Sequence, residues 1–282
     1  MLFRSLRINY NLAASVAQRS LGASQDNYAK QAERLATGLR INKAGDDAAG
    51  MAVSERLKNQ VRGLNQAARN AQDGISMIQT AEGAMGEAHN ILARMRELAI
   101  QSSNDTLTST DRTNLQVEFS ALYSEIDRIA TATQFNGTAI LTGGSTSLSL
   151  QIGANNGNTV TLNVTPSSGF QPTRLDASFT GAGASITTQS LASATITVLD
   201  SAVNAVSTAR ASLGAMQSRL ESAGRSIAVA SENAAAANSR IADADIADSM
   251  SELVRAQILQ QAGISVLAQA NQAPSLVLQL LK

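Results

Sequence analysis

Residues 199–241, LDSAVNAVSTARASLGAMQSRLESAGRSIAVASENAAAANSRI, decide the fold of this 282-residue chain. Every seventh position of the stretch is apolar, and a second apolar set follows three residues behind the first. This is the a/d seam of a coiled coil, which a helix must bury against another helix. The two sets are Leu199, Val206, Leu213, Leu220, Ile227, Ala234 and Ile241, and then Ala202, Ala209, Met216, Ala223, Ala230, Ala237 and Ala244.

A matching ladder lies in the first half of the chain. Its positions are again seven residues apart, namely Leu57, Leu64, Ala71, Ile78, Met85, Leu92 and Ala99. Each ladder is the obvious partner of the other, so the chain is predicted to turn in its middle and to pair the helices of its two halves. The large side chains that we expect to form this assembly seam are Leu57, Leu64, Ile78, Leu92, Leu199, Leu213, Leu220 and Ile227.

Composition excludes several classes of function. The 22 basic and 22 acidic residues give a net charge of zero, so we expect no nucleic-acid partner. There is no Cys, and the single histidine, His89, cannot form a two-His zinc site. No apolar run approaches a membrane span of roughly 20 residues, and the first residues lack the apolar core of a signal peptide. We therefore expect no membrane partner, no metal, no cofactor and no enzyme; the aspartates at 243, 245 and 248 fit a solvated face.

The remaining pattern divides the chain into segments. We predict a helix over 3–40, an irregular connector with Ser54 capping the next helix, and a further helix capped by Thr110 or Asp111. Alternating residues at 147–152 and 159–164 predict a β-hairpin, followed by surface loops to residue 190. Helix is expected again over 191–242, with a register break at 243–246. The fold class is thus mainly α, a long antiparallel helical coiled-coil bundle from both chain ends with a small β-hairpin region in the middle.

Several motifs resemble bacterial flagellin, and they occur in the order found in that family. The match covers roughly 1–140 and 195–282. The motifs are LATGLRIN at 35–42 with DDAAG at 46–50, RNAQDGIS at 69–76, TAEGA at 80–84, TQFNG at 133–137, SRIADAD at 239–245, QILQQAG at 257–263 and NQAP at 271–274.

The resemblance implies a structural subunit that assembles with itself into the extracellular filament of the bacterial flagellum. It implies export, unfolded, through the flagellar type III apparatus, and as partners an export chaperone and the hook-associated junction and cap proteins. It implies a form of the family with little or no variable outer domain. The domains expected are an inner domain of 1–42 plus 245–282, a connector at 43–54, an outer helical domain of 55–140 plus 191–244, and a hairpin and loops at 141–190.

The two ends of the chain are the segments that we expect to take part in assembly. Terminal helices are marginal alone, so we predict that residues 1–40 and 245–282 are disordered in the monomer and fold against neighbours. The apolar residues Ile246, Leu253, Ile264 and Leu267 mark a terminal segment for assembly and chaperone binding.

Residues 92–101 resemble the family segment that is bound by the flagellin-sensing Toll-like receptor. Arg94 and Leu98, in LARMRELAIQ at 92–101, and Glu118 align with that segment's contacts. Axial packing between subunits is the other use of this surface.

Two alternative functions remain open. A hook–filament junction protein shares the terminal helices but is expected to lack the motifs at 35–50 and 271–274. A secreted coiled-coil adhesin or immune-ligand module would need a binding domain in the middle, where only about 50 residues are available.

Overall fold

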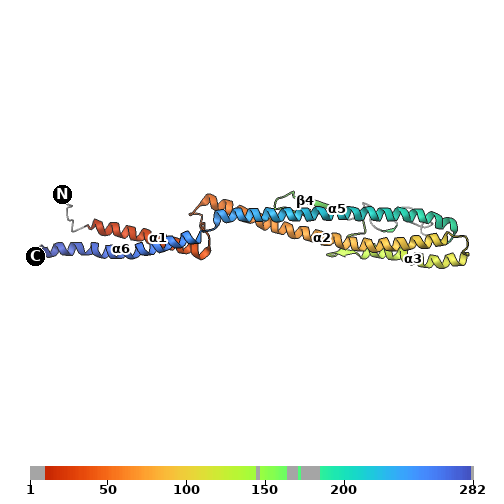
Figure 1. Ribbon diagram of the computed structural model, residues 1–282, viewed down its shortest axis with the longest axis horizontal. Coiled ribbons are helices and arrows are strands. Elements are labelled where there is room, and N and C mark those ends of the chain that lie inside the picture. The colour runs from red at the N-terminus through yellow and green to blue at the C-terminus, as the bar shows by residue number, and fades with distance from the viewer. Residues whose placement is uncertain (1–9, 144–146, 164–170, 173–184, 281–282) are drawn as a thin grey trace. The chain divides into compact units, whose positions relative to one another are not determined.

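The computed structural model describes residues 10–143, 147–163, 171–172 and 185–280 (Figure 1). These residues are mainly helical, as predicted. The helices are α1 (Leu12–Thr37), α2 (Ala48–Ser102), α3 (Ser109–Ala132), α5 (Gln189–Ala242) and α6 (Ile246–Leu280); the strands are β1 (Gln134–Phe135), β2 (Thr138–Ala139), β3 (Ser147–Gln151) and β4 (Thr159–Asn163). None of the helices in these ranges has the length and apolarity needed to cross a membrane.

The chain divides into two compact units. The terminal unit contains Met1–Asn59 and Asn233–Lys282, and the central unit contains Gln60–Glu232. The long helices α2 and α5 contribute residues to both. Within the central unit the two helices run antiparallel, because Ser231 of α5 bonds to Asn65 whereas Arg96, further along α2, bonds to Asp200, earlier in α5.

All of the large buried apolar side chains except Ile41 lie in the central unit, where α2, α3 and α5 pack together (Figure 1). The two heptad ladders meet there, which is the predicted coiled coil. Helix α3 adds an aromatic group, Phe119, that is fully buried. The fully or almost fully buried side chains of this core include Ile78, Met85, Leu92, Leu98, Phe119, Ile126, Leu199, Leu213 and Leu220.

The predicted β-hairpin is formed by β3 and β4, with Leu150 opposite Val160. It lies close to α2, because an added Cβ at Gly74 would collide with the Leu150 side chain. The Asn70 amide on the same helix donates to the Gln151 carbonyl at 2.9 Å. Gly74 therefore lets the hairpin approach the helix.

A tighter hairpin joins β1 and β2 directly after α3. Its central residues, Asn136 and Gly137, have φ angles of 51° and 76°. Two consecutive positive φ values are typical of a type I′ turn, in which Asn-Gly is the preferred pair.

Helix boundaries differ from the predictions at two places. Helix α2 begins at Ala48, not after Ser54, because Asp47 Oδ1 accepts from the Gly50 amide at 2.8 Å and so caps the helix. Ser54 lies within the helix, where its buried hydroxyl donates to Asn238 Oδ1 at 2.7 Å. Helix α3 is capped by Thr108, in a capping box with Asp111, and not by the predicted Thr110 or Asp111.

In the terminal unit, α1 and α6 pack side by side and antiparallel. The Asn11 amide of α1 donates to the Ala270 carbonyl of α6 at 2.7 Å. The register break predicted at 243–246 is where α5 ends and α6 begins. The helix predicted over 3–40 is observed from Leu12 to Thr37; residues 1–9 and most of the loops predicted over 165–190 lie outside the described residues.

Candidate assembly surface

The terminal unit buries few large apolar side chains. Among its described residues, Ile41 is the only buried apolar side chain larger than alanine. The others are Ala17, Ala234, Ala242 and Ala256. Since buried apolar area supplies most of the free energy of folding, this unit is weakly stabilised by its own packing.

The same unit leaves its large apolar side chains in solvent. Of the fourteen large apolar side chains that are exposed in the described residues, eleven belong to it. They are Tyr10, Leu12, Val16 and Tyr28 at α1, and Ile246, Met250, Val254, Ile258, Leu259, Ile264 and Val266 on α6. A helix that is apolar on every side is normally buried on every side. Exposed patches of this kind mark contacts with other protein molecules.

The predicted terminal segment belongs to this apolar surface. Ile246 and Ile264 are about half exposed, at 50% and 54%. Leu253 and Leu267 are partly covered. All four lie on α6, so an apolar surface extends along at least 22 residues of the helix.

The predicted seam residues are used inside the chain. Leu64, Ile78, Leu92, Leu199, Leu213, Leu220 and Ile227 are buried, and Leu57 is partly buried. The seven buried side chains belong to apolar clusters of the same chain, so they help to hold the subunit together.

Of the three residues aligned with the receptor segment, Arg94 and Glu118 are exposed and Leu98 is buried. The Arg94 guanidinium donates to Glu118 Oε1 at 2.9 Å and to Glu97 Oε2 at 3.0 Å. These bonds, the one to Glu118 first, raise the pKa of Arg94 above its ordinary value. Leu98 is only 1% exposed. Arg94 and Glu118 can thus touch a partner, whereas Leu98 can only support the helix beneath them.

Asp46, the first residue of the DDAAG motif, organises the α1–α2 loop. The Asp46 carboxylate forms an ion pair with Lys30 at 2.9 Å and accepts from the amides of Asn42 and Lys43. The bond from Lys30, followed by the two amides, lowers the pKa of Asp46 from 3.8 to about 2. A neighbouring ion pair, Lys43 to Glu33 at 2.8 Å, also ties the loop to α1.

The aspartates near the α5–α6 break serve as local hydrogen-bond acceptors. Asp245 Oδ1 accepts from the amides of Ala247 and Asp248 at the start of α6, and Asp243 accepts from the Ser239 hydroxyl. No group of His, Cys, Asp and Glu suited to a metal ion occurs among the described residues.

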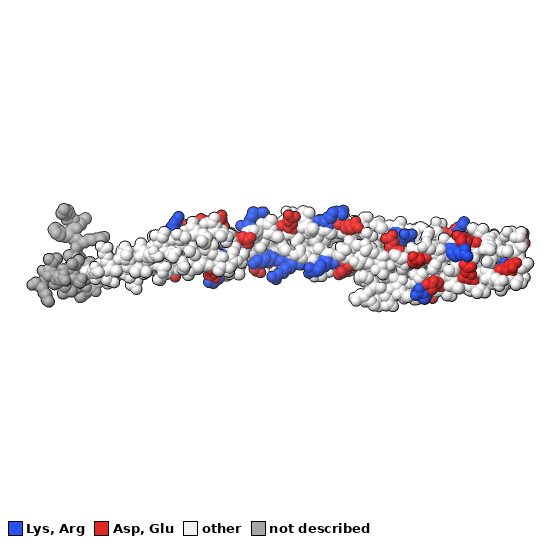
Figure 2. All heavy atoms as spheres, turned by 60° about the horizontal axis from the view of Figure 1, so that its bottom comes forward, with Lys and Arg blue, Asp and Glu red and all other residues white. Residues whose placement is uncertain are grey.

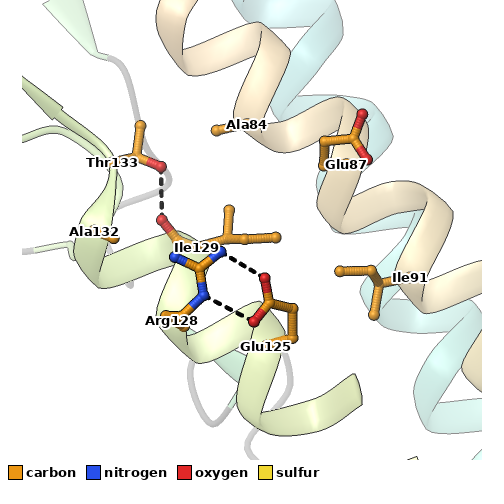
Figure 3. Close-up of a pocket in the computed structure, with 8 residues that line it drawn as sticks. All are labelled: Ala84, Glu87, Ile91, Glu125, Arg128, Ile129, Ala132 and Thr133. Atoms are coloured by element: carbon orange, nitrogen blue, oxygen red, sulfur yellow. Dashed lines mark hydrogen bonds and ion pairs between the residues drawn. The ribbon is translucent and has the colours of Figure 1, made fainter. Parts of the chain in front are cut away.

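An open groove of about 340 Å³ lies between α2 and α3 in the central unit (Figure 3). Ala84, Glu87 and Ile91 approach it from α2, and Ile129 faces them from α3. On the α3 side, Arg128 is held by both carboxylate oxygens of Glu125, at 2.6 and 2.8 Å. No periodic pattern in the sequence indicates this groove, because the groove depends on how α3 packs against α2.

Two family models match the chain in the order of its helices. The bacterial flagellin N-terminal helical region matches residues 8–146, and the bacterial flagellin C-terminal helical region matches residues 196–281. The chain belongs to the flagellin family.

Individual flagellins match it over nearly their whole length. A flagellin of Halalkalibacterium halodurans is 49% identical and covers 98% of this chain and 99% of its own. A flagellar filament 30.7 kDa core protein of Treponema maltophilum is 44% identical over 97% of this chain and 99% of its own. A solved structure, described as the crystal structure of Bacillus cereus flagellin, is 32% identical, with a TM-score of 0.49 over 56% of this chain and 88% of its own.

Flagellin is a structural protein and not an enzyme. As a flagellin, this chain is a subunit of the flagellar filament, an extracellular polymer formed by its association with itself.

Proposed function

We propose that the terminal unit is the part of this flagellin that polymerises, and that α1 and α6 become ordered only when neighbouring subunits cover them. The observation that carries the proposal is the contrast within the unit, whose large apolar side chains are exposed while mainly alanines are buried. Neighbours that covered α6 on all sides would supply the missing apolar burial.

In this proposal the chain has the domains expected from the family. Residues 1–42 plus 245–282 form the inner filament domain, and residues 43–54 connect it to the outer part. Residues 55–140 plus 191–244 form the outer helical domain, and residues 141–190 form the hairpin and its loops.

Substitutions on α6 test the assembly role. Ile258→Gln combined with Val266→Gln removes two exposed apolar side chains and keeps a residue type that favours helix. We expect the critical concentration for growth from filament seeds to rise about tenfold or more, equivalent to at least roughly 1.4 kcal/mol. Val229→Gln is the matched control, since Val229 is equally exposed, at 58%, but lies in the central unit.

Two results would contradict the proposal. One is growth of the α6 variant at the wild-type critical concentration. The other is strong hydrogen-exchange protection of α1 and α6 in dilute monomer, because helices that order only in the filament must exchange rapidly before it forms.

Before assembly, the same apolar segment is the proposed binding site of the export chaperone. Ile246 and Ile264 are exposed on α6, where a partner groove could take them. Ile264→Gln combined with Leu267→Gln should weaken chaperone binding, measured by calorimetry, and Val229→Gln should not. If the wild-type chain and both variants bound the chaperone with equal affinity, the proposed chaperone site on α6 would be wrong.

The proposed export route is the flagellar type III apparatus, with the chain unfolded. The lack of cysteine fits this route, since no disulfide has to form or be broken on the way. Cells with an inactive apparatus should retain the chain inside, and secretion that continued in such cells would show another route.

At the filament ends, the proposed partners are the hook-associated junction and cap proteins. The alternative is that the chain is itself a junction protein, and growth from seeds separates the two. A filament subunit adds repeatedly and gives long uniform filaments, whereas a junction protein binds an end and stops. The other alternative, a secreted adhesin or immune-ligand module, predicts no growth and no binding to ends.

We also propose that the surface around Arg94 and Glu118 binds the flagellin-sensing Toll-like receptor. Both side chains are exposed and meet between α2 and α3, and arginine is common among residues that dominate binding. Arg94→Ala should weaken binding to the receptor ectodomain about tenfold or more. Arg128→Ala removes a comparable ion pair from α3 and should leave binding unchanged. Equal loss in both variants would assign the effect to α3 packing.

A further inference from the structure

Most of the exposed apolar residues of α6 form a ridge along the helix. Its members recur every four residues, and all of them except the small Ala262 are large side chains that are between 47% and 59% exposed. Rows of residues four apart are the ridges with which helices pack against one another. The row, here called the α6 ridge, consists of Ile246, Met250, Val254, Ile258, Ala262 and Val266.

The α6 ridge is distinct from the side of α6 that packs on α1. On that side the covered or partly covered residues alternate in steps of three and four, as in paired helices. They contact α1 directly, since an added Cβ at Gly263 would lie 3.3 Å from the Leu21 side chain and the Ala270 carbonyl accepts from Asn11. These residues are Leu253, Ala256, Gln260, Gly263, Leu267 and Ala270. Within one chain, the α6 ridge is therefore left in solvent.

Charged side chains do not interrupt the α6 ridge. The charged residues in the described part of α6 are Asp248, Glu252 and Arg255, all at positions outside the ridge. Figure 2 shows the surface next to the grey chain ends almost wholly in white, because α6 carries no charge from residue 256 to residue 280. The ridge is thus suited to an apolar contact and not to an ionic one.

Met250 is the only exposed methionine among the residues that the structure describes, with 48% of its surface in solvent. Met51 and Met216 are partly buried, and the Met216 sulfur also accepts from the Arg219 guanidinium at 3.9 Å. The other described methionines are at most 5% exposed in the core of the central unit, and they are Met77, Met85 and Met95.

An exposed thioether is open to oxidation by peroxides. A sulfur lone pair attacks one oxygen of hydrogen peroxide, so that the O–O bond breaks and an S–O bond forms. The hydroxide that leaves takes the proton of the new S–OH group, which gives methionine sulfoxide and water. The sulfur is oxidised and the peroxide is reduced. The sulfoxide is polar, so its burial in an apolar contact without a hydrogen-bond partner costs free energy.

We infer that Met250 is an oxidation site that controls assembly. Peroxide converts Met250 of the free subunit to the sulfoxide, the oxidised subunit no longer adds to a filament, and methionine sulfoxide reductases restore it. Ile246 and Val254 lie one turn away on either side, so a neighbour that covers both must also cover the sulfoxide. This inference rests on the proposed function, because it takes α6 as part of the polymerising surface.

Peptide mass spectrometry of peroxide-treated protein tests where the reaction occurs. In dilute monomer, we expect Met250 to gain an oxygen atom about tenfold faster or more than the buried Met77, Met85 and Met95. In grown filaments, the reaction of Met250 should slow by about tenfold or more, because neighbouring subunits cover the α6 ridge. Oxidation of Met250 no faster than of the buried methionines, or equally fast in monomer and filament, would overturn the inference.

Growth from filament seeds tests the effect of the oxidation. The critical concentration of the peroxide-treated wild-type chain should rise about tenfold or more, and incubation with methionine sulfoxide reductases should restore the untreated value. Met250→Leu removes the sulfur but keeps an apolar helix former of similar volume, so this variant should grow equally well before and after peroxide. Met216→Leu is the matched control from the central unit, and it should stay as sensitive to peroxide as wild type.

The outcomes distinguish this inference from the proposed function. If the untreated wild-type chain does not grow from seeds, the proposed function fails. If it grows, the inference is overturned by any of three results, namely unchanged growth of the treated wild type, lost growth of the treated Met250→Leu chain, or no recovery with the reductases. Thermal unfolding of the treated monomers shows whether the core methionines have reacted, and the peroxide treatment is kept short of that point.

Discussion

Leu39 and Asp243 form an isolated antiparallel β-bridge that joins the segment between α1 and α2 to the segment between α5 and α6. The Arg40 amide donates to the Ala242 carbonyl at 2.7 Å, and the Ala244 amide donates to the Gly38 carbonyl at 2.9 Å. The Arg40 guanidinium adds a bond to the Ile241 carbonyl at 2.8 Å. The interruptions after α1 and after α5 are therefore held together by backbone bonds.

Gly38→Ala should weaken this joint. Gly38 ends α1 with φ +70°, a left-handed conformation that costs an L residue about 1–2 kcal/mol. We expect faster hydrogen exchange at the Arg40 and Ala244 amides. Gly45→Ala is the control, since Gly45 has open space and no positive φ, and it should leave both amides unchanged.

Asp46→Asn should make the α1–α2 loop insensitive to acid. The pKa of Asp46 is lowered from 3.8 to about 2, so its ionised form stabilises the folded loop. That contribution is present above pH 3.8 and is lost as the pH falls toward 2. Hydrogen exchange at the Asn42 and Lys43 amides should show weaker protection in the variant at pH 5, and the difference from wild type should shrink below pH 3.8 and disappear well below pH 2. A constant difference across this range would contradict the assignment.

Gly74→Ala and Gly83→Ala should shift stability in opposite directions. Alanine favours helix over glycine by about 1 kcal/mol. At Gly83 nothing lies within 4 Å of the added methyl group, so the protein should gain roughly that amount. At Gly74 the methyl group meets Leu150, Leu220 and Leu162, and overpacking costs typically 1–3 kcal/mol. Urea unfolding of the two variants measures both shifts, and equal gains would show that the hairpin moves freely away from α2.

Leu92→Ala should destabilise the monomer by about 2–5 kcal/mol, because Leu92 is fully buried between the helices. Ile100→Ala, on the same helix, should change stability by less than about 0.5 kcal/mol, because Ile100 is 46% exposed. Thermal unfolding at low protein concentration compares the two. A small effect at Leu92 would mean that the core of the central unit contributes little to folding.

Periodicity in the sequence was enough to predict the coiled coil. Leu92 and Leu199 belong to two ladders, and in each ladder an apolar residue recurs every seven positions. Since each helix then has one apolar face to bury, the two helices are expected to pack against each other. The β3–β4 hairpin was equally predictable from the sequence, because strict alternation of apolar and polar residues identifies a half-buried strand.

Features that depend on single contacts were not predictable in this way. Ser54 was a plausible helix cap by residue type, but Asp47 provides the cap and Ser54 pairs with Asn238 instead. Leu98 aligned with a receptor contact, yet its side chain faces the core. Asp46 lies in a quoted motif, but its ion pair with Lys30 was not predictable, because Lys30 is 16 residues earlier in the sequence, on α1.

The scarcity of buried apolar side chains around α1 and α6 has a kinetic consequence. If α1 and α6 order only against neighbours, as we propose, two free subunits that meet in solution offer each other only part of the cover that α6 needs, while both must lose the entropy of ordering their ends. A subunit that arrives at an existing filament tip finds several neighbours already in place. On this proposal, starting a new filament is much slower than lengthening an existing one, so subunits add to existing tips and do not form scattered aggregates.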